Sequence, residues 1–461
     1  RAGESRYATL DLAPRDNGVV AVTDRRASIW DIDVPHPETT FASIFGKVWY
    51  EGYDGPTYTW QSSSGTDSFE PKLSLVPLIF GTIKAAFYSL LFAVPLAIAA
   101  AIYTSEFVHP TVRGVVKPTM ELMASLPSVV LGFIAALILA PIVETWIAAV
   151  LMGFIGIPMG LFLGAYLWQM LPTPVALRYG NVPKFLLMFV AIGLALVACY
   201  AGGGLFERLL FGGDFRAWAN GSIGSGAPFL FLMLWPLAFF VSLHLFDRYI
   251  DPQHAHRIRE LPRARGGAID MVRWLGIVVL SAAIAYGLGA LLDGIGGDPR
   301  GSVVGTYVQR NTLVVGFAMA FAVIPLIYTI AEDALNAVPE HLRGASLACG
   351  ATPWQTAIRV ILPTAASGVF AAVMVGMGRA VGETMIVVMA AGNTPILEWN
   401  IFNGLRALSA NIAVELPEAV KDSTLFRMLF LAALVLFAMT FIINTAAELV
   451  RQRFRKRSAQ L

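Results

Sequence analysis

Arg379 and Glu383 are two opposite charges inside VFAAVMVGMGRAVGETMIVVMAA, an apolar stretch long enough to cross a membrane. A charge at mid-bilayer depth costs at least about 2.5–3.5 kcal/mol on insertion scales. The two residues are four apart, which predicts that they share one face of a helix and offset each other. Ionisable residues within the membrane are also candidates for a substrate path, and an arginine fork binds two oxygens of an anion at once. An oxyanion path is therefore the sharper hypothesis, and structural pairing is the alternative.

Two glycines flank this arginine, and they predict close helix packing. Gly378 and Gly382 form a GxxxG face, which lets a neighbouring helix approach. Arginine before glutamate is the weaker order for a pair within one helix. Part of the compensation is therefore expected from other helices or from a ligand.

A proline interrupts a second apolar stretch, ELMASLPSVVLG. Pro127 would free the carbonyl of Met123 and kink a helix there. The hydroxyls of Ser125 and Ser128 could then face a polar path, or they could bond back to their own helix.

The composition identifies a polytopic membrane protein, since 56% of the 461 residues are hydrophobic and only 14% are charged. A net charge of +2 does not favour nucleic-acid binding. His254 and His256 have no companion ligands, so we expect a solvated loop, with no metal and no cofactor. Lys84 is expected to snorkel from the outer end of its helix.

Nine apolar stretches of spanning length follow a polar, β-type segment over residues 1–73. Lysine and arginine lie mostly in the loops on the side of the C-terminal tail RQRFRKR. This bias predicts that the C-terminus is cytoplasmic and that the segment over residues 1–73 lies outside. Because that exported segment has no signal peptide, we expect an upstream helix and a chain truncated at its N-terminus. The nine stretches are 75–104, 119–143, 146–168, 185–203, 228–247, 271–292, 310–330, 365–391 and 426–448.

A polar elbow over residues 332–363 predicts two short helices joined by a tight corner. Pro339 suits the first position of a helix, and Gly350 can take the left-handed conformation that ends it. Thr352, Pro353 and Gln355 then form a capping box that restarts the chain as a helix. Ordinary loop helices are the alternative interpretation.

This elbow resembles the EAA loop of binding-protein-dependent ABC-transporter permeases. The resemblance implies that the elbow docks onto a separate cytoplasmic ATPase, and no GxxxxGK phosphate loop is present in this chain. Gly344 stands where the family has Glu, which puts a salt bridge to the ATPase in doubt. The matching residues are Ala345, Ser346, Gly350, Leu362 and Pro363.

Three further runs resemble the PstC-type permease subunit of phosphate-specific ABC importers. They are GRAVGETMIV at 378–387, ELMASLPSVVLG at 121–132 and VPLIFGT at 76–82. The resemblance implies an all-α, MetI-like permease core over residues 74–145 and 301–450, an insertion of four extra helices at 146–300, and a basic cytoplasmic tail at 451–461. It also implies a non-enzymatic subunit of the inner membrane that carries inorganic phosphate.

The implied partners are a second permease of the PstA type, an ATPase dimer of the PstB type and an external phosphate-binding protein of the PstS type, within membrane lipid. A permease for another oxyanion and an ion-gradient-driven transporter are the alternatives. An ion-gradient-driven transporter would need no docking elbow. An intramembrane enzyme would need convergent catalytic groups, which the sequence does not offer.

Overall fold

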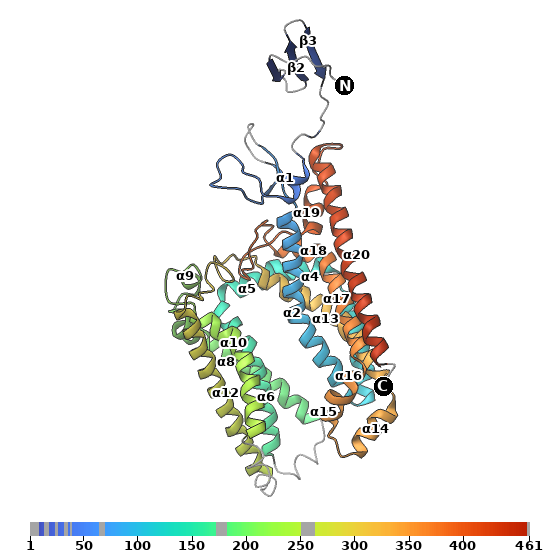
Figure 1. Cartoon of the computed structure of the whole chain (residues 1–461). Coiled ribbons are helices and arrows are strands. Elements are labelled where there is room, and N and C mark those ends of the chain that lie inside the picture. Colours follow the sequence, from blue (N-terminus) through green and yellow to red (C-terminus); the bar gives the residue numbers. More distant parts are fainter. Residues whose placement is uncertain are drawn as a thin grey trace.

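The computed structural model describes residues 9–12, 18–23, 26–31, 36, 39–63, 70–171, 182–249 and 263–458. Helices dominate, and the first strands and the C-terminus lie at opposite ends of an elongated molecule (Figure 1). We call these the strand end and the elbow end, the latter because helices α14 (Glu340–Ala348) and α15 (Pro353–Thr356) lie there (Figure 1).

The strand end begins with a small antiparallel sheet. Strands β1 (Thr9–Leu12), β2 (Gly18–Thr23) and β3 (Arg26–Asp31) pair in chain order, as the alternation of Val, Ile and Trp predicts. A short helix, α1 (Phe41–Phe45), and a two-stranded pair, β4 (Trp60–Gln61) and β5 (Lys72–Leu73), lead into the first long helix. The indole N–H of Trp60 donates to Glu415, 3.1 Å away, which anchors this segment to the helices.

A central bundle is built around α13 (Thr312–Asn336), the most deeply buried of the candidate spans. It lies against α2 (Val76–Glu106), where Gly316 leaves room for Tyr88. The bundle also contains α3 (Pro110–Ala124), α4 (Ser128–Ile134), a π-helical turn (Ala135–Leu139), α5 (Ala140–Thr145), α17 (Ala366–Gly382), α18 (Met385–Ala390), α19 (Leu408–Glu415) and α20 (Thr424–Ser458).

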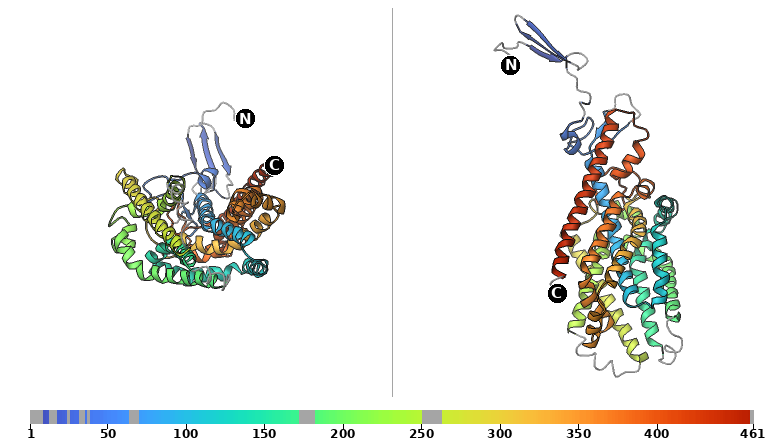
Figure 2. Two further views of the ribbon diagram at one scale, coloured as in Figure 1. Left: turned by 90° about the horizontal axis from the view of Figure 1, so that it is seen from below. Right: turned by 90° about the vertical axis from the view of Figure 1, so that its right-hand side faces the viewer.

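A peripheral bundle of four long helices stands to one side of the central one (Figures 1 and 2). It comprises α6 (Ile147–Met170), α8 (Val182–Phe211), α10 (Ala227–Tyr249) and α12 (Arg263–Gly294), with the short α9 (Phe215–Ala219) between α8 and α10. On α6, Gly156, Gly160 and Gly164 pack against small side chains of α8, so the two helices approach closely.

The described residues contain eight helices that are long and apolar enough to cross a membrane, or nine if the bent pair Pro353–Thr364 and Ala366–Gly382 counts as one span. The nine predicted stretches agree with that count. Two of them are not single helices, however. The 119–143 stretch is divided between α3 and α4, and the 365–391 stretch between α17 and α18.

The predicted position of one lysine is wrong. Lys84 on α2 does not snorkel, because its side chain is completely buried and its Nζ has no hydrogen-bond partner among the described residues. The loop that carries Trp399 covers this part of α2, where the hydroxyl of Tyr88 donates to the carbonyl of Trp399 at 2.7 Å. Packing of that loop, which the local sequence does not encode, encloses the amine.

Candidate functional site

The stretch that carries the two intramembrane charges is broken between them. Helix α17 ends at Gly382, and Glu383 follows with extended backbone before α18 starts at Met385. The prediction that Arg379 and Glu383 share one continuous helical face is therefore wrong. Among the described residues no ion pair joins their side chains.

Contacts from both sides hold this break in place. The hydroxyl of Ser409 on α19 donates to the backbone carbonyl of Glu383 at 2.9 Å, and the Glu383 carboxylate accepts from the N–H of Ile386 at 3.5 Å. Polar backbone at membrane depth is tolerated where protein or a water-filled cavity surrounds it. The break is thus a built feature of the bundle.

Arg379 lies on a strip of α17 that the rest of this chain leaves uncovered. Its neighbours one turn away on the same face are Val375, whose side chain is 47% exposed, and Gly382, which is also exposed. The guanidinium itself is half-buried, and its Nε has no hydrogen-bond partner among the described residues. The chain therefore holds a guanidinium with a buried donor lacking a partner among the described residues, beside an open face.

A second break lies beside the first. Pro127 is not inside a helix, as predicted, but caps α4 after α3 has ended at Ala124. On α4, Gly132 packs so closely against α18 that a Cβ there would lie 3.0 Å from the carbonyl oxygen of Met385. Gly132 is one turn beyond the start of α4 and Met385 is the first residue of α18, so the two helices that follow the breaks pack against each other near their starts.

The two serines at this second break behave differently. The hydroxyl of Ser125 donates to the carbonyl of Leu122 at 2.7 Å, which is the back-bonded alternative. Ser128 is half-buried at the start of α4. The structure therefore leaves Ser128 as the better of the two candidates for a polar path.

A groove of about 470 Å³ runs between α17 and α20 next to the arginine. Gly378 lines it, and a Cβ there would lie 3.2 Å from the side-chain oxygen of Asn444 on α20. Among the described residues, nothing lies within 4 Å of where a Cβ of Gly382 would be, so of the predicted GxxxG pair only Gly378 packs against a described helix. Asn444 is exposed in the run FIINT, and this amide in an apolar helix is the signal that the sequence analysis missed.

The elbow has the predicted local structure. Gly350 follows α14 with a φ of 86°, which only glycine adopts without strain. Thr352 caps α15, its hydroxyl accepting from the N–H of Gln355 at 3.2 Å while the Gln355 side chain accepts from the N–H of Thr352 at 2.9 Å. The hydroxyls of Ser346 and Thr356, 2.9 Å apart, tie the two helices together. Pro339 is one residue earlier than predicted, at the cap of α14 rather than at its first turn.

Ion pairs attach the elbow to the spanning helices. The Arg343 guanidinium on α14 lies 3.2 Å from the carboxylate of Glu106, the last residue of α2, and donates to the carbonyl of Leu335 on α13 at 2.7 Å. A rigid link of this kind would transmit a displacement of α14 to both α2 and α13.

Beside that link, α3 is held to α13. Glu332 is buried and forms ion pairs with Arg113 and Lys117, and Lys117 also pairs with Asp333. The hydrogen bond to Asp333 is the main cause that raises the pKa of Lys117 above its usual range, with Glu332 adding to it. Ion pairs therefore join α14 to α2 and, separately, α3 to α13 at the elbow end of the bundle.

The outer surface of the elbow is free to bind something else. None of the nine residues of α14, all of which the structure describes, is buried. Apolar side chains stand out on it, with Leu347 47% and Trp354 59% exposed. Leu362 is half-buried and Pro363 exposed at the corner that leads into α17. An exposed apolar patch on a capped, anchored corner is typical of a docking site.

Comparison with known proteins agrees with this arrangement. Residues 259–456 match the family model described as the binding-protein-dependent transport system inner membrane component. The matched segment contains the elbow, Arg379, Glu383 and Asn444. The matched segment is therefore similar to this permease family, and the curated relatives of the chain are of the PstC type.

Curated relatives carry the phosphate name. "Phosphate transport system permease protein PstC 1" of Mycobacterium tuberculosis is 36% identical over 34% of this chain and 46% of its own length. PstC of Mesorhizobium japonicum is 34% identical over 30% of the chain and 42% of its own length. PstC of Haemophilus influenzae is 24% identical over 74% of the chain and 93% of its own length. The present chain thus covers about half the length of the first of these relatives. No solved structure matches it.

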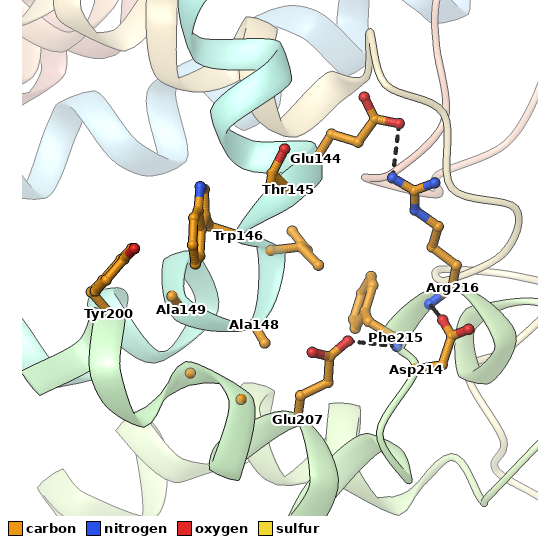
Figure 3. A pocket seen from close by; sticks show the side chains of 13 residues that line it. Glu144, Thr145, Trp146, Ala148, Ala149, Tyr200, Glu207, Asp214, Phe215 and Arg216 are labelled. Carbon is orange, nitrogen blue, oxygen red and sulfur yellow. Dashed lines mark hydrogen bonds and ion pairs between the residues drawn. The ribbon is translucent and has the colours of Figure 1, made fainter.

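A separate polar pocket of about 460 Å³ lies where the central and peripheral bundles of the permease meet (Figure 3). Its charges are used within the protein. Arg216 pairs with Glu144 at 2.8 Å, Glu207 accepts from the N–H of Phe215 at 2.9 Å, and Asp214 caps α9. This pocket therefore joins the two bundles, and its arginine is not left for an anion.

The remaining histidine pair of the sequence analysis, His254 and His256, lies outside the described residues.

Proposed function

We propose that this permease carries inorganic phosphate across the cytoplasmic membrane as one of two membrane subunits of an ATP-driven importer. The observation that carries the proposal is the position of Arg379, on an uncovered strip of α17 next to two adjacent helix breaks. Its curated relatives are named as phosphate permeases.

The chemistry of the breaks suits an oxyanion. Arginine donates two parallel hydrogen bonds to a phosphate, and this arginine has an Nε without a partner among the described residues. Discontinuous helices supply free backbone groups at membrane depth, as substrate sites of other transporters do. Glu383 and Ser128 add an acceptor and a hydroxyl, and protonated phosphate offers a donor to that carboxylate.

A second permease, of the PstA type, would cover the open strip and complete the path. Polar and charged side chains of membrane proteins face protein or water rather than lipid. Two exposed residues of this chain, Val375 and Asn444, line the groove between α17 and α20. Gly382, one turn beyond Arg379, is exposed as well. The phosphate path therefore runs along this face, between two subunits.

ATP would act through the elbow. A cytoplasmic ATPase dimer of the PstB type binds the exposed face of α14 and α15, and the Arg343–Glu106 pair passes its movement to α2. The exposed, anchored corner favours this mechanism over an ion-gradient-driven transporter, which has no use for it. The permease itself carries out no bond chemistry.

The orientation follows from that assignment. The elbow and the tail at 451–461 lie in the cytoplasm, and the β-type segment at 1–73 lies outside, where an external phosphate-binding protein of the PstS type delivers phosphate. Residues 74–145 and 301–450 form the permease core, with the docking loop at 332–363. Residues 146–300, the peripheral bundle, are an insertion.

Uptake of radiolabelled phosphate into vesicles that contain all four kinds of subunit tests the proposal. We expect uptake to require ATP on the side of the membrane where the ATPase is bound, and to persist when a protonophore collapses the proton gradient. Uptake that continues without the ATPase would overturn the importer, and stronger competition by sulfate than by phosphate would assign another oxyanion.

A further inference from the structure

A polar pocket of about 350 Å³ lies within the peripheral bundle, near its elbow end. Three helices line it. Tyr166 and Gln169 come from the last turns of α6, Leu243 from α10, and Asp270, Arg273 and Trp274 from the first half of α12. It shares no residue with the Arg379 face, the elbow or the junction pocket.

One side chain of this pocket suggests that a ligand binds there. Trp274 is only 6% exposed, yet its indole N–H has no hydrogen-bond partner among the described residues. A buried donor without a partner is unfavourable, so the free N–H needs an explanation. Its ring packs against Phe162 and Tyr166 of α6, with centroids 5.8 and 5.7 Å away.

The other polar groups of the pocket have both signs of charge. Arg273, whose guanidinium lies over the ring of Phe246, is a cation, and Asp270 is one helical turn before it on α12. Gln169 adds an amide that donates to Asp270 at 3.4 Å. One arginine and one aspartate suit a zwitterion better than an inorganic anion, which the carboxylate would repel.

The pocket lies toward one end of the helices that line it, and the ends of spanning helices are where lipid headgroups are met. Arg273 is ten residues into α12, about 15 Å from the helix start, and Gln169 is one residue before the end of α6. Next to it, Val272 is 65% and Leu245 49% exposed, so an apolar surface continues from the pocket along α12 and α10. Tryptophan, tyrosine and arginine together are typical of the membrane interface.

We propose that this pocket binds the headgroup of a zwitterionic, amine-bearing phospholipid such as phosphatidylethanolamine. Its phosphodiester accepts from Arg273 and from the N–H of Trp274, its ammonium pairs with Asp270, and its acyl chains follow the exposed apolar side chains. The proposal concerns the peripheral bundle alone and does not depend on phosphate transport.

Native mass spectrometry of the full-length chain in nanodiscs tests it. In phosphatidylethanolamine discs the wild type should retain one lipid after detergent extraction. Trp274→Phe, which keeps an aromatic ring but removes the indole N–H together with the five-membered ring, should lower that occupancy, and Arg273→Gln should lower it about tenfold. Arg265→Gln, an exposed arginine on the same helix, should retain the lipid.

Two further arms decide the ligand. Asp270→Asn should remove the preference for phosphatidylethanolamine over phosphatidylglycerol, and millimolar inorganic phosphate should not displace the lipid. Equal occupancy in wild type, Trp274→Phe and Arg273→Gln would overturn the proposal. Displacement by inorganic phosphate, or no preference between the two lipids in the wild type, would overturn it equally.

Discussion

The central and peripheral bundles follow different construction rules. At the heart of the central bundle, 67% of the most apolar stretch of α13 and 44% of that of α2 are buried, whereas the four peripheral spans, like α20 at the edge of the central bundle, are 11–22% buried. The central bundle encloses Lys84, holds Arg379 and is broken at Pro127 and Glu383. The long peripheral helices are unbroken and approach one another through small residues.

The difference indicates that the central bundle carries the functional site. Intramembrane charges and interrupted helices are costly, and they occur together in the central bundle. Of these features, Arg379 and the break at Glu383 lie in the segment, residues 259–456, that matches the permease family. A scaffold for lipid contact needs neither. Substitutions in the central bundle should therefore change transport, and substitutions in the peripheral bundle should change stability.

The largest effect is expected at Arg379. Arg379→Ala removes two charge-assisted hydrogen bonds to the anion, so ATP-driven phosphate uptake should fall about 100-fold. Uptake into vesicles with all subunits measures it, and Arg427→Ala, an exposed arginine of α20, is the control. Normal uptake by Arg379→Ala in an intact complex would remove this residue from the path.

The next effect concerns the link between the elbow and α2. Arg343→Ala breaks the pair with Glu106, so phosphate carried per ATP hydrolysed should fall about tenfold while the ATPase remains bound. Parallel measurement of uptake and ATP hydrolysis checks this ratio. Arg359→Ala, an exposed arginine of the same elbow, should leave it unchanged. A loss of ATPase binding in Arg343→Ala would instead make this arginine part of the docking surface.

A smaller effect is expected from the buried lysine. Lys84→Met keeps the length of the side chain and removes a buried charge. Glu398, the acid that acts electrostatically on Lys84, is exposed, so the substitution does not leave a buried carboxylate without its counter-charge. We expect the Tm of the purified complex to rise by about 2 °C. Scanning fluorimetry measures it, with Lys421→Met, an exposed lysine, as control. A lower Tm would show that the amine has a stabilising partner.

The smallest effect on transport is expected in the peripheral bundle. Gly160→Leu forces α6 away from Ala195 on α8, at a cost of about 1–3 kcal/mol, yet uptake should stay near the wild-type rate. Cys199 lies at the same contact between α6 and α8 and is only 4% exposed. If the helices separate, maleimide should label Cys199 faster, which is measured in a Cys349→Ser background so that no other cysteine reacts. Gly193→Leu, on open α8 surface, should not accelerate labelling. A large loss of uptake in Gly160→Leu would couple the two bundles.

Local rules predicted the elbow well, because its determinants are neighbours in the sequence. The Thr352–Gln355 capping box and the left-handed Gly350 depend on residues within one turn. The same local reasoning failed at Glu383, which lies in an apolar run that reads as one helix. There the break is held by Ser409, a residue of another helix.

Hydropathy and charge spacing by themselves determined that this chain is a polytopic helical membrane protein with charges inside an apolar stretch. Those properties depend on composition and on contacts over a few residues. The tertiary structure alone decided that Arg379 and Glu383 lie on either side of a helix end, that Lys84 is enclosed, and that Asn444 lies beside Gly378. Each of these depends on which distant segments pack together, and that is set by the shape of the assembled bundle.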